Sequence, residues 1–129
     1  MPKPSPRVSI VDDEPSVRNA LARLLRAQSF DVETFSSAAE FIGSLGAAVP
    51  DCLVVDFHMP EMTGLELQNY LQRADIFIPT IVITAHDDAS VRRLCEVGGA
   101  SAFLVKPLSN SVLIAAIERA VGSERVPVV

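Results

Sequence analysis

Five short apolar runs alternate with five segments of helical period along this chain, and this alternation restricts the possible folds more than any other feature. The runs cover residues 8–11, 32–35, 52–55, 81–83 and 102–105. Four of them are almost continuously apolar, which is typical of strands buried on both faces. The run at 32–35 alternates more between apolar and polar residues, so we expect this strand at an edge of the sheet.

The intervening segments repeat their apolar residues every three or four positions, as amphipathic helices do. Pro15 suits the first turn of the first segment, because the N–H that proline lacks would have no partner there. Ser37 and Glu40 have the spacing of a capping box before the second segment. The other three segments are expected over about 64–74, 89–97 and 110–121. Three glycines stand where C-terminal caps belong: Gly46, Gly98 and Gly122.

Strands that alternate with helices, without a hairpin signal, predict an α/β fold: a (βα)5 doubly wound parallel sheet with helices on both faces. The 129 residues suit one domain. We expect this domain over residues 1–122, with 123–129 as a tail or the start of a linker. Cys52 and Cys95 have no metal-site spacing, so we expect both to be buried thiols.

Charge and hydropathy limit which partners the chain can bind and where in the cell it is expected. The net charge of −5 argues against direct nucleic acid binding, which needs a basic face. The apolar runs are far shorter than the roughly 20 residues that cross a bilayer. No secretory signal pattern precedes the first strand. These features predict a cytoplasmic chain that binds no membrane.

The side chains with the strongest chemistry all follow directly after predicted strands. They are Asp12, Asp13 and Glu14, then Asp56, Thr84 and Lys106. Ligands of open parallel sheets bind at the carboxyl ends of the strands, so we expect these groups at one rim. Clustered carboxylates repel one another, and Mg²⁺ (or Mn²⁺) would relieve the repulsion through oxygen ligands. An ionised aspartate beside such an ion is a competent nucleophile for phosphoryl transfer, with the lysine as a phosphate-binding charge.

Four motifs in this order resemble the receiver domain of two-component response regulators. They are Val11-Asp12-Asp13-Glu14-Pro15, Val55-Asp56 with Met59-Pro60-Glu61-Met62-Thr63-Gly64, Ile83-Thr84-Ala85, and Lys106-Pro107. The similarity is greatest to receivers of the FixJ/NarL type, which usually precede a DNA-binding domain. It implies the CheY-like, flavodoxin-like strand order 2-1-3-4-5.

The resemblance also implies a role for each residue that matches a motif. Asp56 would be the phosphoacceptor and a metal ligand, Asp13 a direct Mg²⁺ ligand, Asp12 a ligand through water, and the His58 backbone carbonyl a further ligand. Thr84 would be the switch hydroxyl, Lys106 would bind the phosphoryl group, and the Lys106-Pro107 peptide bond would be cis. Phe103 would be the switch aromatic, and the alternative is that it only fills the core.

The resemblance further implies partners and an output. The phosphoryl donor would be a sensor histidine kinase or a phosphotransfer protein. Phosphorylation would reshape the face made by the fourth helix, fifth strand and fifth helix, and so control a partner, a homodimer or an attached DNA-binding domain. The alternative is a stand-alone receiver or phosphorelay intermediate that acts by docking. Such a chain is not an enzyme beyond its own phosphoryl transfer and slow autodephosphorylation.

Two other functions use related folds or chemistry. A haloacid-dehalogenase-like phosphatase wants a second acid two residues after the nucleophile, where this chain has His58. A nucleotide-binding flavodoxin-like module wants a glycine-rich phosphate loop, and the chain has neither GxGxxG nor GxxxxGK[ST]. His58 and His86 are either exposed loop residues without a role or groups that tune hydrolysis of the phosphoryl group. Arg92 and Arg93 are expected on a solvated helix face or a partner surface.

Overall fold

The computed structural model describes residues 5–125, with the side chains of 5–122, and its sheet has the predicted architecture. The five strands are all parallel and lie in the order β2-β1-β3-β4-β5. Their bounds are β1 (Arg7–Val11), β2 (Asp31–Phe35), β3 (Cys52–Asp56), β4 (Thr80–Thr84) and β5 (Ala102–Val105). The flavodoxin-like order 2-1-3-4-5 is therefore confirmed, as is the edge position of β2.

The expectation that the run at 102–105 would be buried on both faces is wrong. β5 is the second edge strand, and of its residues only Phe103 is buried. An edge strand has a neighbour on one side only, so its flanks reach solvent even where its composition is apolar. The three inner strands β1, β3 and β4 are buried almost throughout, in agreement with their continuous apolar sequences.

Five helices connect or follow the strands. They are α1 (Pro15–Ala27), α2 (Ala38–Ser44), α3 (Gly64–Arg73), α4 (Ala89–Val97) and α5 (Asn110–Arg125). Pro15 occupies the first position of α1, as expected. Ser37 caps α2 by accepting a hydrogen bond from the Glu40 N–H, but the Glu40 carboxylate accepts from Ser36 rather than from Ser37. The pattern therefore marked the start of α2 correctly without forming a complete capping box.

The predicted glycine caps are only partly found. Gly98 is the C-cap residue of α4, and Gly99 after it has a positive φ of 97°. Gly46 lies beyond the C-cap of α2, which is Leu45. Gly122 caps nothing, because α5 continues through it to Arg125. A single glycine costs a helix only about 1 kcal/mol, so one glycine is a weak stop signal where the helix still packs on the sheet.

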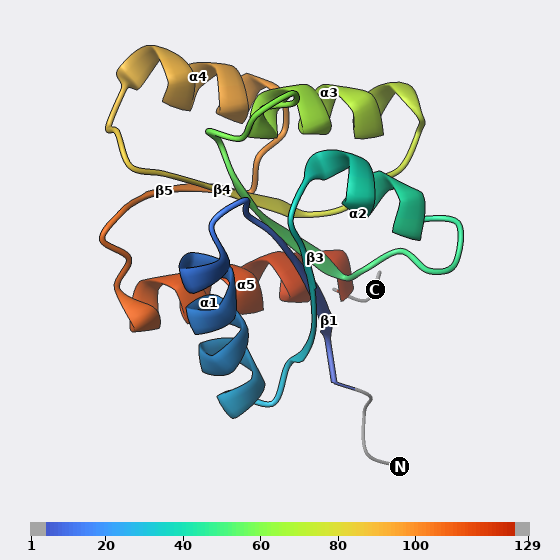
Figure 1. Ribbon diagram of the computed structural model, residues 1–129, viewed down its shortest axis with the longest axis vertical. Helices are drawn as coiled ribbons and strands as arrows, with labels where there is room; N and C mark the ends of the chain where they lie inside the picture. The colour runs from blue at the N-terminus through green and yellow to red at the C-terminus, as the bar shows by residue number, and fades with distance from the viewer. Residues whose placement is uncertain (1–4, 126–129) are drawn as a thin grey trace.

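Helices cover both faces of the sheet and create two cores. Figure 1 shows α1 and α5 on one side and α2, α3 and α4 on the other. Leu25 of α1 and Ile117 of α5 belong to the first core, and both are fully buried. Phe41 of α2 and Leu67 of α3 belong to the second, where they are also fully buried. This double cover explains why the inner strands read as continuous apolar runs.

The remaining expectations on the fold concern membranes and thiols. Within residues 5–125, no helix combines the length and the apolar character that a bilayer crossing needs. Cys52 and Cys95 are both buried thiols, as predicted.

Candidate functional site

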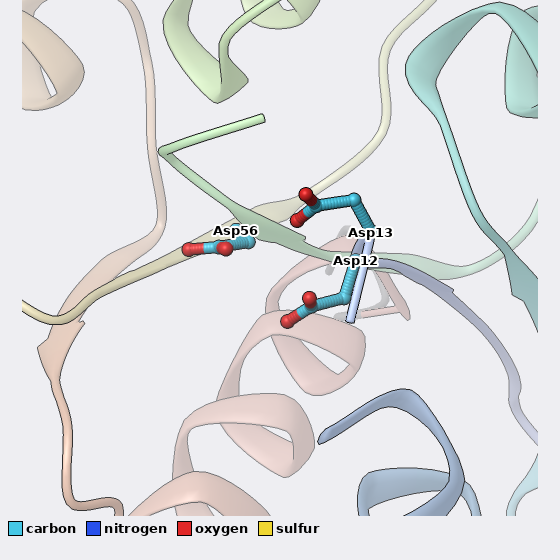
Figure 2. Close-up of side chains that lie close together, drawn as sticks. All are labelled: Asp12, Asp13 and Asp56. Atoms are coloured by element: carbon cyan, nitrogen blue, oxygen red, sulfur yellow. The ribbon is translucent and has the colours of Figure 1, made fainter. Parts of the chain in front are cut away.

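Three carboxylates meet at the carboxyl end of the sheet. Asp12 and Asp13 follow β1 directly, and Asp56 is the last residue of the adjacent strand β3. One carboxylate oxygen from each of the three lies within 4.8 Å of the others. Asp12 and Asp56 are buried and Asp13 is exposed, so the group opens to solvent on one side. Figure 2 shows the three side chains gathered at the ends of the two strands.

Lys106, directly after β5, brings a positive charge to this group. Its Nζ lies 3.9 Å from Asp12 Oδ2 and 3.9 Å from Asp56 Oδ2. Its backbone N–H donates to the Thr84 carbonyl at 2.8 Å, which fixes the loop after β5 against the end of β4. The lysine therefore contacts two carboxylates at the outer limit of ion pairing and leaves space between them.

One lysine does not compensate for burying two acids. Burial chiefly, and then the negative charge of Asp12, raise the pKa of Asp56 to about 6, although Lys106 and the His58 N–H lower it. Burial also raises the pKa of Asp12, against the lowering effects of the Glu14 N–H and Lys106. Both carboxylates thus lack counter-charge, and their ionised forms would gain from a further cation.

The hydrogen bonds of Asp12 indicate where such a cation would be held. Asp12 Oδ1 accepts from the Glu14 N–H at 2.9 Å, and Arg18 Nη1 donates to the Asp12 backbone carbonyl at 2.7 Å. Asp12 Oδ2 is buried and accepts no hydrogen bond from any residue that the structure describes. Buried carboxylate oxygens without donors are costly. An oxygen-rich cluster with an unsatisfied buried oxygen fits a hard divalent ion such as Mg²⁺.

Thr84 ends β4 beside this cluster and is almost completely buried. Its Oγ1 accepts a hydrogen bond from the His86 N–H at 3.2 Å. The rings of His86 and His58 lie with their centroids 5.5 Å apart and nearly perpendicular. The two exposed histidines therefore lie together, although they come from the loops after two different strands.

The geometry thus assembles the acids, the lysine and the threonine at the predicted rim, and comparison with known proteins gives the family. The family described as the response regulator receiver domain matches residues 8–118. The chain belongs to the response regulator receiver family. It is accordingly a regulatory signal-transduction domain rather than a classical enzyme, and receivers typically bind Mg²⁺ at an acidic site of this kind.

Individual receivers of known proteins are similar over nearly the whole chain. Nodulation protein W of Bradyrhizobium diazoefficiens is 37% identical over 118 residues, which are 92% of this chain and 52% of that protein. Transcriptional regulatory protein FixJ of Rhizobium meliloti is 42% identical over 113 residues, covering 88% and 55%. The crystal structure of FixJ-N matches with a TM-score of 0.87, 38% identity and full coverage of both chains. This receiver spans about half the length of these curated relatives.

Phe103 of the receiver has a contact that the sequence did not reveal. The ring is buried on β5, and the Arg92 guanidinium of α4 lies 4.8 Å from its centroid. Arg92 also pairs with Asp87 in the loop before α4, at 3.2 Å. Arg92 is therefore not a purely solvated residue, whereas Arg93 is exposed as expected. A cation over an aromatic ring leaves no sequence signature when the two residues lie on different elements.

The last site feature is the peptide bond between Lys106 and Pro107, which is cis. It directs the chain from β5 into the loop that leads to α5, beginning at Asn110. The acids, Thr84 and Lys106 are thus located at or next to one rim of the sheet, whereas Phe103 lies within β5.

Proposed function

We propose that this chain receives a phosphoryl group on Asp56 from a phosphohistidine of a sensor histidine kinase or a phosphotransfer protein, within a cytoplasmic signalling pathway. The observation that carries the proposal is the proximity of Asp13, Asp56 and Lys106. The acids offer ligand oxygens within 4.8 Å of one another, and the lysine Nζ lies 3.9 Å from Asp56 Oδ2. A divalent ion and a phosphoryl group would fill the space between these groups together.

Each residue has a distinct part in the transfer. An oxygen of Asp56 attacks the phosphorus in line, the bond to the donor histidine nitrogen breaks, and that nitrogen keeps the electron pair. Lys106 binds a phosphoryl oxygen and offsets its charge. Asp13 and Asp56, the His58 carbonyl, and Asp12 through water would hold the ion. When bound, Mg²⁺ (or Mn²⁺) would supply positive charge to the phosphoryl oxygens.

The switch would begin at Thr84. Its hydroxyl now accepts from the His86 N–H, and in the phosphorylated form it would donate to a phosphoryl oxygen. Phe103 lies one strand away on β5, in register beside Val82. Arg92 of α4 contacts the Phe103 ring and also pairs with Asp87 in the loop after β4. Movement of this loop would therefore change the packing of α4 against the ring. The α4-β5-α5 face would then bind a partner, a second copy or an attached DNA-binding domain, as a two-state equilibrium biased by one charged group.

Phosphorylation with a small-molecule donor tests the proposal directly. The chain would be incubated with Mg²⁺ and acetyl phosphate, or with Mg²⁺ and beryllofluoride, and followed by intact mass and sedimentation. We expect a single phosphoryl adduct in the wild type, none in Asp56→Asn, and none when EDTA replaces Mg²⁺. In Asp13→Asn, which lacks a proposed Mg²⁺ ligand, adding Mg²⁺ should no longer promote formation of the adduct. A phosphoryl adduct that persists in Asp56→Asn would place the nucleophile elsewhere.

A further inference from the structure

We propose that His58 and His86 form a second metal site, for Zn²⁺, next to the acidic Mg²⁺ site. These are the two histidines of the chain. They are 28 positions apart in the sequence and come from the loops after β3 and β4. The structure nevertheless places their ring centroids 5.5 Å apart, with both side chains exposed. This inference concerns metal binding alone and does not depend on the proposed phosphorylation.

The ring geometry suits one shared ion. Zinc binds imidazole nitrogen at about 2 Å in tetrahedral geometry, so two imidazoles on one ion have centroids roughly 5 Å apart. The observed centroid distance of 5.5 Å is close to this spacing, although the rings now pack edge to face at an interplanar angle of 84°. Both rings are exposed, so rotation about their side-chain bonds can turn a nitrogen edge toward the ion. Water would fill the remaining coordination positions from the solvent side.

Backbone contacts hold both histidines in place before any ion arrives. The His86 N–H donates to Thr84 Oγ1 at 3.2 Å, and the His86 carbonyl accepts from the Asp88 N–H at 3.1 Å. The His58 N–H bonds the Asp56 carboxylate. The His58 ring packs edge-on against Phe57 with a centroid distance of 4.8 Å. Because the backbones of both histidines are held, less entropy is lost when their side chains turn toward a shared ion.

Ligand chemistry separates this pair from the neighbouring acids. Imidazole nitrogens suit zinc and other late transition metals, whereas carboxylate oxygens suit Mg²⁺. The three carboxylates of Asp12, Asp13 and Asp56 add a negative potential at the same rim, which raises the local concentration of any divalent cation. We therefore expect the two sites to differ in selectivity, with Zn²⁺ bound by the histidines while Mg²⁺ stays with the acids.

Zinc titration in the presence of saturating Mg²⁺ tests the proposal. With two histidines in the chain, their imidazole signals in ¹H–¹³C NMR spectra report each ligand separately. We expect one Zn²⁺ per chain by calorimetry, with both imidazoles perturbed in the same titration. His58→Ala and His86→Ala should each weaken zinc binding about tenfold or more, on the scale of losing a group that supports a metal site.

The matched control is Asp13→Asn, which removes an acid and keeps both histidines. It should lose Mg²⁺ binding. Because both imidazole ligands remain, it should weaken zinc binding only slightly, through the loss of one nearby negative charge, and by less than either alanine variant does. Far-UV circular dichroism and Mg²⁺ binding of the histidine variants show whether they fold, and His86→Asn provides a second, polar replacement. Zinc binding that survives in either alanine variant, or that disappears in Asp13→Asn, would assign the ion to the acids and overturn the proposal.

Discussion

Asp56 is a residue whose proposed chemistry, as an ionised carboxylate, lowers the stability of the fold. Its side chain is only 6% exposed and shares its surroundings with the fully buried Asp12. A buried carboxylate is stable when hydrogen bonds or opposite charges surround it. Here Lys106 is 3.9 Å from both acids, too distant for a short charge-assisted hydrogen bond. The site therefore keeps a nucleophile ionised at the expense of stability, and a bound cation would remove part of this cost.

The first prediction follows from the pKa of Asp56, which burial and the charge of Asp12 raise from 3.8 to about 6. Between these values the folded state binds more protons than the unfolded chain. The free energy of unfolding therefore falls as pH rises through this window and stays low above it. In EDTA, Asp56→Asn removes the buried charge and should raise the free energy of unfolding at pH 8 by about 1 to 3 kcal/mol.

Urea unfolding of both proteins at several pH values measures this difference. Below the pKa of Asp56 in the unfolded chain, Asp56 is protonated in both the folded and the unfolded state. The higher free energy of unfolding of Asp56→Asn should therefore vanish there. Added Mg²⁺ should stabilise the wild type and have little effect on the variant, because the variant lacks a ligand carboxylate. Equal free energies of unfolding of the two proteins at pH 8 without metal would contradict the claim that the buried Asp56 carboxylate destabilises the fold.

The second prediction concerns the same two histidines in the hydrolysis of the phosphoryl group. His58 and His86 lie two residues after Asp56 and Thr84, and their rings lie together with their centroids 5.5 Å apart. We expect His58→Ala and His86→Ala to change the half-life of phosphorylated Asp56, since each ring can screen or orient the attacking water. The measurement is the decay of the phosphoryl adduct in chelated zinc-free buffer. Decay rates equal to that of the wild type in both variants would exclude this role.

At the scale of elements, short sequence motifs fix how each helix leaves its strand. Thr63 caps α3 by accepting from the Glu66 N–H, and the Glu66 carboxylate accepts from the Thr63 N–H. This complete capping box has the S/T-x-x-E spacing, so the sequence carries the same signal before α3 as at Ser37 before α2. Asp88 caps α4 in a similar way through the N–H groups of Ser90 and Val91.

Glycine positions give the third prediction, because two glycines with opposite surroundings can be exchanged for alanine. A Cβ on Gly64 would lie 3.2 Å from the Asp56 carbonyl oxygen and 3.2 Å from the Phe57 Cα. These backbone atoms, next to the proposed phosphoacceptor, cannot move away freely. Gly64→Ala should therefore destabilise the fold by about 1 to 3 kcal/mol and slow phosphorylation by displacing Asp56.

The matched control is Gly43→Ala in α2, where a Cβ would meet nothing within 4 Å. Alanine is the better helix former, so this variant should be stabilised by up to about 1 kcal/mol with unchanged phosphorylation. Chemical denaturation and the rate of adduct formation from acetyl phosphate distinguish the two outcomes. Similar effects of both substitutions would mean that the close approach at Gly64 has no consequence.

The order of strands and helices was predictable from the sequence, because a doubly covered parallel sheet demands both the apolar runs and the intervening amphipathic segments. The rim was predictable for the same reason, since side chains that follow parallel strands must emerge at one edge. Distances were not. That Asp12 Oδ2 lacks a donor, or that Arg92 lies over Phe103, depends on side-chain placement between elements distant in sequence, which no local pattern encodes. The strand order itself came from the family resemblance.

At the scale of the whole molecule, the sheet divides the protein into two cores and gathers the chemistry at one edge. The inner strand β3 is buried along its length and contributes alternately to both cores, through Val54 on one face and Leu53 on the other. Asp56, the proposed nucleophile, ends this strand. Neighbouring strands on both sides hold β3 in place, whereas β5 at the edge has a neighbouring strand on one side only.

The fourth prediction separates residues that maintain the fold from those that serve the output face. Leu25 is completely buried in the core under α1, whereas Leu94 on α4 is 54% exposed. Leu25→Ala should lower the free energy of unfolding by about 2 to 5 kcal/mol, since it leaves a cavity. Leu94→Ala should change it by no more than about 0.5 kcal/mol, because little of its surface is withdrawn from water.

The effect of Leu94→Ala should instead appear in the activated protein. Leu94 and Val97 of α4, at 54% and 78% exposure, present apolar surface beside the open edge of β5. If beryllofluoride drives two copies together through the α4-β5-α5 face, sedimentation velocity should show a larger species for the wild type and a weaker association for Leu94→Ala. Arg23→Ala, on the exposed side of α1 and remote from that face, is the control and should associate as the wild type does. Loss of association in the α1 variant, with retention in Leu94→Ala, would move the output surface from the α4-β5-α5 face to α1.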